Sequence, residues 1–392
     1  MGAIQPELDH AIRWMLYSGI INNDPNNRET YGGVNAYYDI GAKGYPFVYT
    51  EITGYAVSLL IYLSKHFGEN AFIEKAQASV NWLIDFMRYE GEDDNAMGSF
   101  SWAYDFRGKR KKTYSFDCGI CARALIDLYK ITGDKRCLSQ AQQTLSWLVK
   151  KMQNEDGSLK PSYDWSQKKS LSNPSIWYEN PGCLHAKMAI PLALGSEVLN
   201  DPTFINSAKS LIQWALKLQR SSGRLIVNTH DKRTNVHAHC YALEGIIYLY
   251  NFLKEGDELL NSFIQGANWL LTAEKNGRLN EWSDVGFLES NLQTTYVASQ
   301  AIRIWLIAHR LTGDKQFMNA ADRALTYVLS TQCNADNSRI RGGFYEGYKK
   351  TGPFTRRINQ INSWATIFAI QALIMHQKYL DYNTEQLISD VI

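Results

Sequence analysis

The chain has 392 residues, 45% hydrophobic and 20% charged, so it is long enough to bury a large core and too apolar to be disordered. Its 41 Lys and Arg against 39 Asp and Glu leave a net charge of +2, which excludes the basic surface of a nucleic-acid-binding protein. No apolar run reaches the ~18 residues of a membrane span, residues 1–7 lack a signal-peptide pattern, and six cysteines are too few for a disulfide scaffold. We therefore expect a cytoplasmic protein that binds neither nucleic acid nor membrane.

A helix is predicted at about Pro6–Ser18, and a repeated unit of two helices follows it. In each unit, a first helix that is apolar nearly all round leads through a turn, such as Gly68-Glu69, into a second, amphipathic helix. The tryptophan of the second helix recurs along the chain at Trp82, Trp147, Trp214 and Trp269, and Tyr327 takes its place in the fifth unit. The first helices are expected to begin near residues 51, 117, 183, 239, 295 and 361.

A glycine closes each unit and is followed by a short aromatic or β-branched stretch; these glycines are Gly98, Gly157, Gly223, Gly277 and Gly343. One buried helix and one half-exposed helix, alternating about six times, predict an all-α (α/α)6 toroid of six hairpins with short β-like loop segments. An open solenoid would need polar terminal repeats, but the first and last inner helices are as apolar as the others. We expect residues 1–392 to form one domain, with the N-terminal helix closing the ring against the final one.

The loops that enter the inner helices carry polar side chains, and a closed ring brings all six loops to one end. Helix capping explains any single Asp, Asn, Ser or Thr there. Capping does not explain His237, His239 or the Arg356-Arg357 pair, because a cation opposes the dipole at a helix N-terminus. We therefore predict a polar pocket at this end. Its candidate residues are Glu51, Asp117, Tyr178, Glu179, His237, His239, Tyr241, Arg357 and Gln360.

The loop after each outer helix repeats a second pattern, an acid beside an aromatic residue or a histidine. The acids are Asp105, Asp164, Asp231, Asp284 and Glu346, and the aromatic residues include Trp102, Trp165 and Trp282. Aromatic rings stack on the flat faces of sugars, and carboxylates accept hydrogen bonds from sugar hydroxyls. The pattern predicts a saccharide site with Trp102, Trp165, Tyr178 and Trp282 near its rim, Asp105 beside them, and Arg357 toward its base. Packing between hairpins would produce the same recurrence.

The repeat resembles the six-hairpin glycosidase superfamily, which includes glucanases, unsaturated glucuronyl hydrolases and sugar 2-epimerases. The segments YTEITGY at 49–55 and SWATIFAIQAL at 363–373 also resemble proteins linked to bacterial polysaccharide gene clusters. The resemblance extends over nearly the whole chain and implies an oligo- or polysaccharide substrate. It carries over no catalytic signature, so the chemistry has to be argued from the residues themselves.

Glycoside hydrolysis needs two carboxyl groups across the scissile bond, ~5 to ~9.5 Å apart. We expect Asp117 and Asp231 to be this pair, with Glu51 as a third candidate. An anionic, uronate-containing saccharide is expected because Arg233 and Arg356-Arg357 have no directly adjacent acid. The alternative is a uronate epimerase or polysaccharide lyase, in which His239 and Tyr241 move the proton and arginine neutralises the carboxylate.

Two further alternatives are open from the sequence. One is a zinc-dependent cyclase-like toroid, since thiols and imidazoles fall near inner-helix starts, at Cys118, Cys121, Cys183, His185, His239 and Cys240. The other is a toroid without catalytic activity that binds glycans or serves as a scaffold. Of the four, we expect a glycoside hydrolase that uses neither metal nor cofactor.

Overall fold

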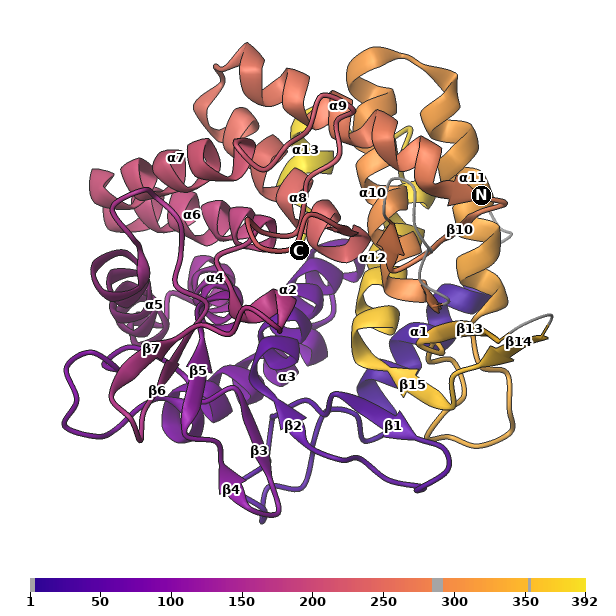
Figure 1. Ribbon diagram of the computed structural model, residues 1–392. Coiled ribbons are helices and arrows are strands. Elements are labelled where there is room, and N and C mark those ends of the chain that lie inside the picture. Colours follow the sequence, from indigo (N-terminus) through magenta and orange to yellow (C-terminus); the bar gives the residue numbers. More distant parts are fainter. Residues whose placement is uncertain (1–3, 284–291, 352–353) are drawn as a thin grey trace.

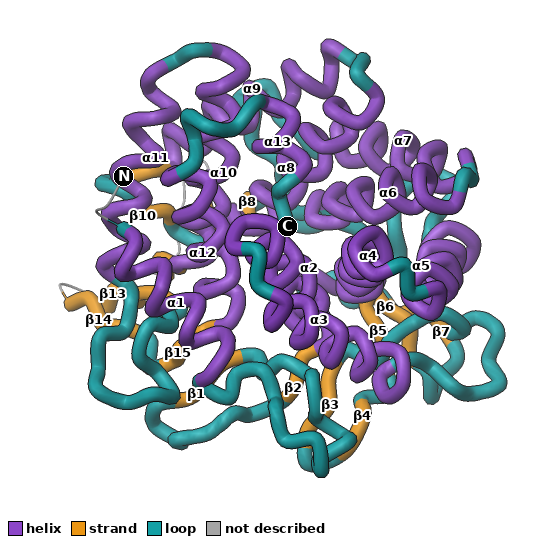
Figure 2. The backbone as a smooth tube through the Cα atoms, turned by 180° about the vertical axis from the view of Figure 1, so that it is seen from behind, coloured by secondary structure: helices purple, strands orange, loops and turns teal. Residues whose placement is uncertain are grey.

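The structure is a computed structural model and describes residues 4–283, 292–351 and 354–392. Helices arranged in two concentric rings surround one axis (Figures 1 and 2). The inner ring contains α2 (Thr50–Phe67), α4 (Ser115–Thr132), η4 with α6 (Cys183–Met188 and Ala189–Leu199), α8 (Val236–Leu253), α10 (Thr295–Thr312) and α12 (Ser363–Gln377). These helices begin within three residues of the expected positions, so the predicted (α/α)6 toroid is confirmed.

Each inner helix packs against the next, and α12 packs against α2, which closes the inner ring. The outer helices are α3 (Asn70–Trp82, continued by η1, Leu83–Met87), α5 (Lys135–Trp147, continued by η2, Leu148–Met152), α7 (Pro202–Leu216), α9 (Asp257–Ala273) and α11 (Lys315–Ser330). The sixth outer helix is α1 (Gln5–Tyr17), which packs against α12 as expected. Chain segments 300 or more residues apart in the sequence therefore form one hairpin.

Short antiparallel strands lie in the loops at one end of the toroid, as the sequence predicted. The closing pair is β1 (Tyr37–Asp39) with β15 (Gln360–Asn362), in which Tyr38 lies opposite Ile361. Three-stranded sheets are formed by β2 (Val48–Tyr49), β3 (Ala103–Asp105) and β4 (Gly108–Lys109), by β5 (Lys112–Tyr114), β6 (Ser162–Asp164) and β7 (Lys169–Leu171), and by β12 (Leu292–Thr294), β13 (Gly347–Thr351) and β14 (Phe354–Arg357). Two further pairs are β8 (Thr234–Asn235) with β11 (Trp282–Ser283) and β9 (Glu274–Lys275) with β10 (Arg278–Leu279).

Six glycines attach these loops to the outer ring. Each has a left-handed φ, and a Cβ on it would lie less than 3 Å from the backbone of a neighbouring outer helix, so only glycine fits. The six are Gly32, Gly98, Gly157, Gly223, Gly277 and Gly342. The expectation of Gly343 in this role is wrong by one residue, since it is Gly342 that lies against the backbone of α1. The last loop thus packs on the first helix of the chain.

Below this end, buried charges fill the axis of the inner ring. Glu244 accepts from Lys187 Nζ at one carboxylate oxygen and from Arg303 Nη2 at the other, both at 2.6 Å. Lys187 also donates to the carbonyl of Ile392, which follows the short helix α13 (Thr384–Ser389) and lies near the middle of the ring (Figure 1). The inner ring is therefore packed rather than hollow beneath the loops. In the part of the chain that is described, no helix combines the length and apolar character that a membrane span requires.

Candidate active site

The first residue of every inner helix is held by the same backbone hydrogen bond. Its N–H donates to a carbonyl in the loop of the next hairpin, over 2.8–3.1 Å. The six pairs are Thr50 with Trp102, Ser115 with Pro161, Cys183 with Val227, Val236 with Glu281, Thr295 with Glu346 and Ser363 with Ala36. Every acceptor lies four residues after one of the six loop glycines. The start of each inner helix and the acceptor residue of each loop are therefore held at equivalent places around the axis.

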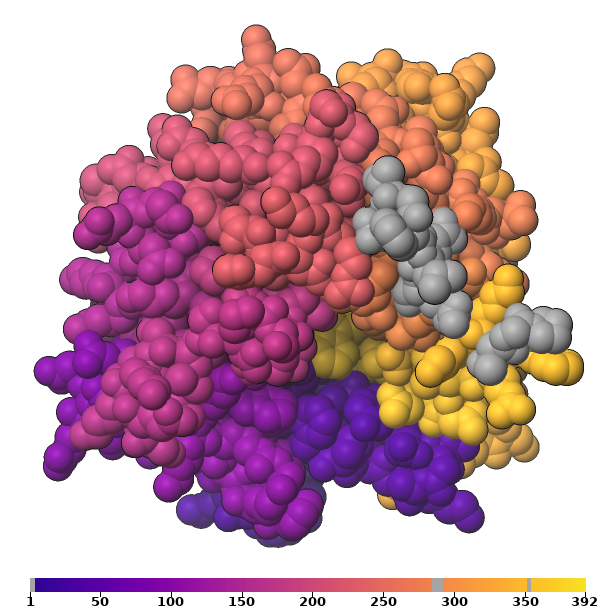
Figure 3. Space-filling model, viewed as in Figure 1, coloured from indigo at the N-terminus to yellow at the C-terminus, as the bar shows by residue number. Residues whose placement is uncertain are grey.

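These two positions surround one cavity of about 420 Å³. The residue after each helix start lines it in all six repeats, at Glu51, Phe116, Leu184, His237, Tyr296 and Trp364. Four of the six acceptor residues line it as well, namely Trp102, Pro161, Glu281 and Glu346. The space-filling view is hollowed where the indigo N-terminal part of the chain meets the yellow C-terminal part (Figure 3).

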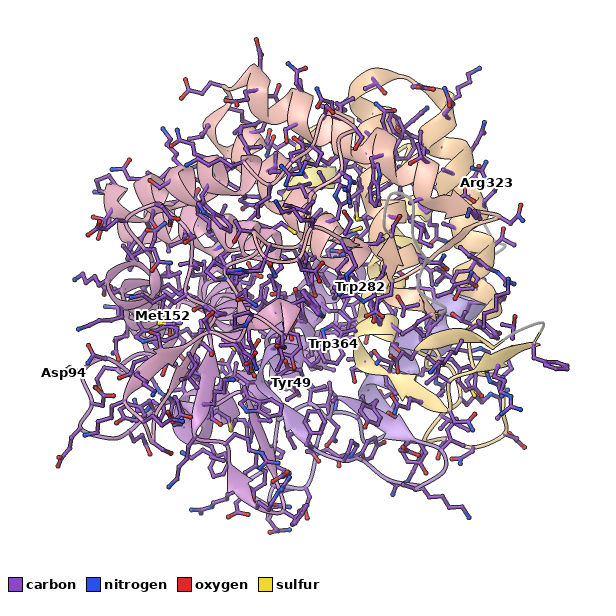
Figure 4. The ribbon with its side chains drawn as sticks, viewed as in Figure 1. Tyr49, Asp94, Met152, Trp282, Arg323 and Trp364 are labelled. Carbon is purple, nitrogen blue, oxygen red and sulfur yellow. The ribbon has the colours of Figure 1, made fainter. Side chains whose placement is uncertain are left out.

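An aromatic wall runs along one side of the cavity. Tyr49 lies edge-on to Trp364 at 5.2 Å between ring centroids and to Trp102 at 5.7 Å, and Figure 4 labels Tyr49 and Trp364 beside the central opening. Trp102 contacts Tyr114, and Tyr114 contacts the half-exposed Tyr178 at the rim. The expectation that Trp102 and Tyr178 belong to the site agrees with these positions.

Two carboxyl groups lie at the starts of neighbouring inner helices. Glu51 is the second residue of α2, is 6% exposed, and accepts a hydrogen bond from Trp364 Nε1 at 3.3 Å. Asp117 is the third residue of α4 and is 3% exposed, and its Oδ2 has no hydrogen-bond partner among the described residues. Burial raises the pKa of Glu51 to about 7. Burial, and then the charge of Glu51, raise the pKa of Asp117 well above its usual range.

A second pair of carboxyl groups, Glu281 and Glu346, lines the same cavity. Burial raises both pKa values, and that of Glu346 reaches about 7 because the charge of Glu281 adds to the effect of burial. Sequence reasoning included Glu346 among the loop acids but missed Glu281. The signal was available, because Glu281 follows Gly277 by four residues, as Trp102 follows Gly98.

His237 and Tyr241 lie four residues apart on α8 and so share one face of this helix, and both line the cavity. Their ring centroids are 4.2 Å apart. His237 Nδ1 lies 2.5 Å from the side-chain oxygen of Gln300, an acceptor, so Nδ1 is the donor and Nε2 is the basic nitrogen. Burial lowers the pKa of His237 to about 4, so the ring is neutral at pH 7.

The structure does not bring His239 to the cavity. Two residues beyond His237 on a helix, it points about 200° away, and its ring lies 4.7 Å from that of Trp269 on α9. Its Nδ1 accepts from the N–H of Leu225, and its Nε2 lies 3.2 Å from the carbonyl of Gly266. His239 therefore links an inner helix to its outer partner, which corrects the expectation that it is catalytic.

Asp231 and Arg357 are also outside the cavity, contrary to expectation. Asp231 forms an ion pair with Arg233 at 2.8 Å and accepts that residue's backbone N–H, so it closes a loop turn. Arg357 lies on the exposed strand β14, with its guanidinium 3.8 Å from the ring centroid of Tyr345. Among the described residues, no Lys or Arg lines the cavity, so the expected site for an anionic sugar is not supported.

The remaining candidates hold the loops together. Asp105 forms ion pairs with Arg107 and Arg110, and Trp165 donates from Nε1 to Ser99 Oγ at 3.2 Å. Gln360 lies in β15, paired with Asp39 of β1.

Two more candidates lie next to the cavity without lining it. Glu179 accepts from Lys112 and from the Tyr114 hydroxyl, so it supports the aromatic wall. Trp282, labelled in Figure 4, lies 5.7 Å from the ring of Trp177, which does line the cavity. Asp284 lies outside the described residues.

The thiols do not form a metal site. All six cysteines are buried and free, and Cys118 accepts the N–H of Phe100. In the described ranges, no group of three or more His, Cys, Asp or Glu side chains is arranged to hold a metal ion. The arrangement therefore does not support the zinc-dependent alternative.

Comparisons of the whole fold place the chain among known toroids. It is similar to cellobiose 2-epimerase from Bacillus thermoamylovorans B4167, with a TM-score of 0.76, 15% identity, and coverage of 94% of this chain and 98% of the other. It is also similar to an unsaturated glucuronyl hydrolase from Bacillus sp. GL1, with a TM-score of 0.66, 15% identity, and coverage of 94% of this chain and 96% of the other. A D-mannose isomerase is similar too, with a TM-score of 0.73, 11% identity, and coverage of 94% of this chain and 97% of the other. No family model and no curated protein sequence matches the chain. The resemblance to the six-hairpin glycosidase superfamily is confirmed at the level of the fold.

Proposed function

We propose that this protein is a carbohydrate-active enzyme that hydrolyses a glycosidic bond, with Glu51 and Asp117 as its catalytic pair. The observation that carries the proposal is the pair itself: two buried carboxyl groups at the starts of adjacent inner helices that line one aromatic-walled cavity. Hydrolysis needs one carboxylic acid and one carboxylate, and environments that separate two pKa values supply both at one pH. Similar toroids include a glucuronyl hydrolase and sugar epimerases, which supports carbohydrate as the substrate class.

The roles follow from the two pKa directions. Asp117, whose pKa burial and the charge of Glu51 raise well above its usual range, acts as the general acid and donates its proton to the departing glycosidic oxygen. Glu51, with a pKa of about 7, supplies the carboxylate on the other side of the bond, either to activate water or to attack the anomeric carbon. The sugar ring stacks on the wall formed by Tyr49, Trp102 and Trp364.

The substrate in this proposal is the end of an oligo- or polysaccharide chain. The cavity lies at the loop end of the toroid, and the buried Lys187–Glu244–Arg303 network blocks the axis below it, so a sugar chain enters from the loop end only. The uronate substrate expected from the sequence is not favoured, because neither arginine lines the cavity: Arg233 pairs with Asp231 and stacks on Trp282 beside it, and Arg357 stacks on Tyr345. A cytoplasmic location stays a prediction.

A second candidate, a sugar epimerase or isomerase, is favoured by His237. The ring of His237 is neutral and lies beside Tyr241, and its Nε2 is the base that abstracts a proton from a sugar carbon in this candidate reaction. The epimerases and the isomerase among the similar folds support this candidate too. It differs from hydrolysis in its product: the substrate keeps its length and exchanges a carbon-bound hydrogen with solvent.

The proposal is tested with conservative variants. In Asp117→Asn and Glu51→Gln, we expect kcat for release of reducing sugar from an oligosaccharide panel to fall by about 10²-fold or more. Asp85→Asn, which changes an exposed aspartate paired with Arg136, is the matched control and retains activity. Wild-type cleavage that survives in both cavity variants would contradict the assignment of this pair.

A further inference from the structure

The charge of the cavity is one-sided. Glu51, Asp117, Glu281 and Glu346 line it, and no Lys or Arg does so among the described residues. Residues 284–291, which lie outside the described part, read DVGFLESN and contain no Lys, Arg or His. Hydrolysis uses two of these carboxyl groups. The other two, Glu281 and Glu346, have no part in the proposed reaction.

Glu281 and Glu346 occupy equivalent positions in consecutive repeats, at the starts of α8 and α10. The Glu281 carbonyl accepts from Val236 at 2.8 Å, and its N–H donates to Leu292 at 2.8 Å. The Glu346 carbonyl accepts from Thr295 at 2.8 Å, and its N–H donates to Gln360 at 3.0 Å. Their backbones are thus fixed on both sides, and both side chains line the cavity.

Both glutamates line the same cavity as Tyr296 on α10. Burial, and then the charges of Glu281 and Glu346, raise the pKa of this tyrosine. Burial raises the pKa of Glu281, and burial followed by the charge of Glu281 raises that of Glu346. Two carboxylates that share a partly buried site without a counter-charge cost free energy, which a bound cation would offset.

Asp117 is a second, independent indication of a ligand. It is 97% buried and lines the cavity, yet its Oδ2 has no hydrogen-bond partner in the part of the chain that is described. A buried carboxyl oxygen without a partner is satisfied when a bound molecule brings a polar group to it. The aromatic rings around it, including Tyr49, Trp102 and Trp364, also favour a cation over an anion.

We propose that the substrate is an amino sugar whose amine is free and positively charged, and that Glu281 and Glu346 bind this ammonium group. The inference rests on the proposed hydrolysis of a saccharide in the same cavity and adds the charge of the sugar. Such a sugar supplies the missing cation to one pair of carboxyl groups and presents its glycosidic bond to the other pair. An N-acetylated sugar lacks the charge, and a uronate reverses it.

Binding of monosaccharides tests the inference, because glucosamine, glucose and N-acetylglucosamine differ only at one carbon and contain no glycosidic bond. By calorimetry on the wild-type protein at pH 7 and low salt, we expect glucosamine to bind about tenfold more tightly than glucose or N-acetylglucosamine. The preference should weaken as salt increases. Equal affinities, or tighter binding of N-acetylglucosamine, would overturn the proposal.

A double variant, Glu281→Gln with Glu346→Gln, locates the effect. It should lose the preference for glucosamine while glucose binds within about twofold of wild type, since glutamine keeps the size of glutamate and its side chain can still hydrogen-bond sugar hydroxyls, but it removes the charge. Glu90→Gln, on an exposed glutamate beside Arg88, is the control and retains the preference. A preference that persists in the double variant would overturn the assignment to these residues. Failure of hydrolysis in the Asp117 test would leave this binding result intact, so the two proposals fail separately.

Discussion

Glu51 carries a free-energy cost that the fold does not need. Its pKa rises from 4.5 to about 7 on folding because the side chain is buried, which corresponds to about 3 kcal/mol at a pH where it is ionised. The folded state binds the Glu51 proton more tightly than the unfolded state does. Protonated Glu51 therefore contributes its full stabilisation below pH 4.5, and this stabilisation is lost as the pH rises through 7. Retaining such a residue at this position is typical of a functional site.

Glu51→Gln should therefore stabilise the protein at high pH. We expect little difference from wild type near pH 4.5, and a variant that is more stable by up to about 3 kcal/mol at pH 8. Thermal unfolding across this range measures the difference, with the exposed Glu90→Gln as the matched control. A variant less stable than wild type at pH 8 would contradict the assigned direction of the pKa.

At the same scale, the sequence predicted the types of residue in the site better than their positions. Glu51, Asp117 and Tyr241 were expected in the cavity and line it. His239 was expected there too, but a difference of two residues from His237 decides which side of α8 a ring occupies. That difference depends on where the helix begins, and sequence patterns place helix ends only to within a few residues.

At the scale of elements, the loop glycines set the spacing of the hairpins. In Gly157, φ is 91°, and a Cβ would lie 2.5 Å from the carbonyl oxygen of Ser210 on α7. Gly133 has a φ of 71° at the end of α4, and nothing lies within 4 Å of the position of its Cβ. Both glycines have a left-handed φ that strains any other residue, but only Gly157 also lies against the backbone of a neighbouring helix.

Gly157→Ala should consequently destabilise the protein far more than Gly133→Ala. We expect about 1 kcal/mol for the helix-end variant, from backbone conformation alone, and several kcal/mol for the loop variant, because α7 must also move. Urea unfolding of the two variants measures both costs. Equal losses of stability would show that the loop glycine is not in close contact with the neighbouring helix.

The sequence marked these elements clearly because glycine and tryptophan recur at fixed places in each repeat. It also suggested the short strands, but not which strands pair, since β1 with β15 joins residues more than 300 apart. That pairing left Gln360 in a backbone ladder and Arg357 on an exposed edge strand. Sequence-based reasoning had placed both of them in the site, because the loop direction was not known.

At the scale of the whole molecule, ring closure makes the first helix equivalent to the others. Trp14 of α1 donates from Nε1 to the carbonyl of Arg339 at 2.9 Å, three residues before Gly342. Trp147 of α5 donates to Asn95 at 2.8 Å, also three residues before its glycine, Gly98. The seam between the two ends of the chain thus uses the same contact as an interior hairpin. That residues 1–392 form one domain stays a prediction.

We predict that Trp14→Phe and Trp147→Phe lower the stability of the whole chain by similar amounts, about 1 kcal/mol each, in one cooperative transition. Unfolding in urea, followed by circular dichroism and by hydrogen exchange of all helices, tests this. In an open solenoid, Trp14→Phe would instead release α1 and α12 in a separate early transition. Observing that early step would contradict closure of the ring.

The central claim is that this cavity cleaves a glycosidic bond with Glu51 and Asp117. The most direct measurement incubates wild type, Asp117→Asn and Asp85→Asn with an oligosaccharide panel in deuterated water, and analyses chain length and carbon-bound deuterium together. We predict shorter chains from wild type and Asp85→Asn, about 10²-fold fewer from Asp117→Asn, and no deuterium on carbon in the recovered substrate. Deuterium on a sugar carbon with no loss of chain length would contradict the claim and favour epimerisation or isomerisation at His237.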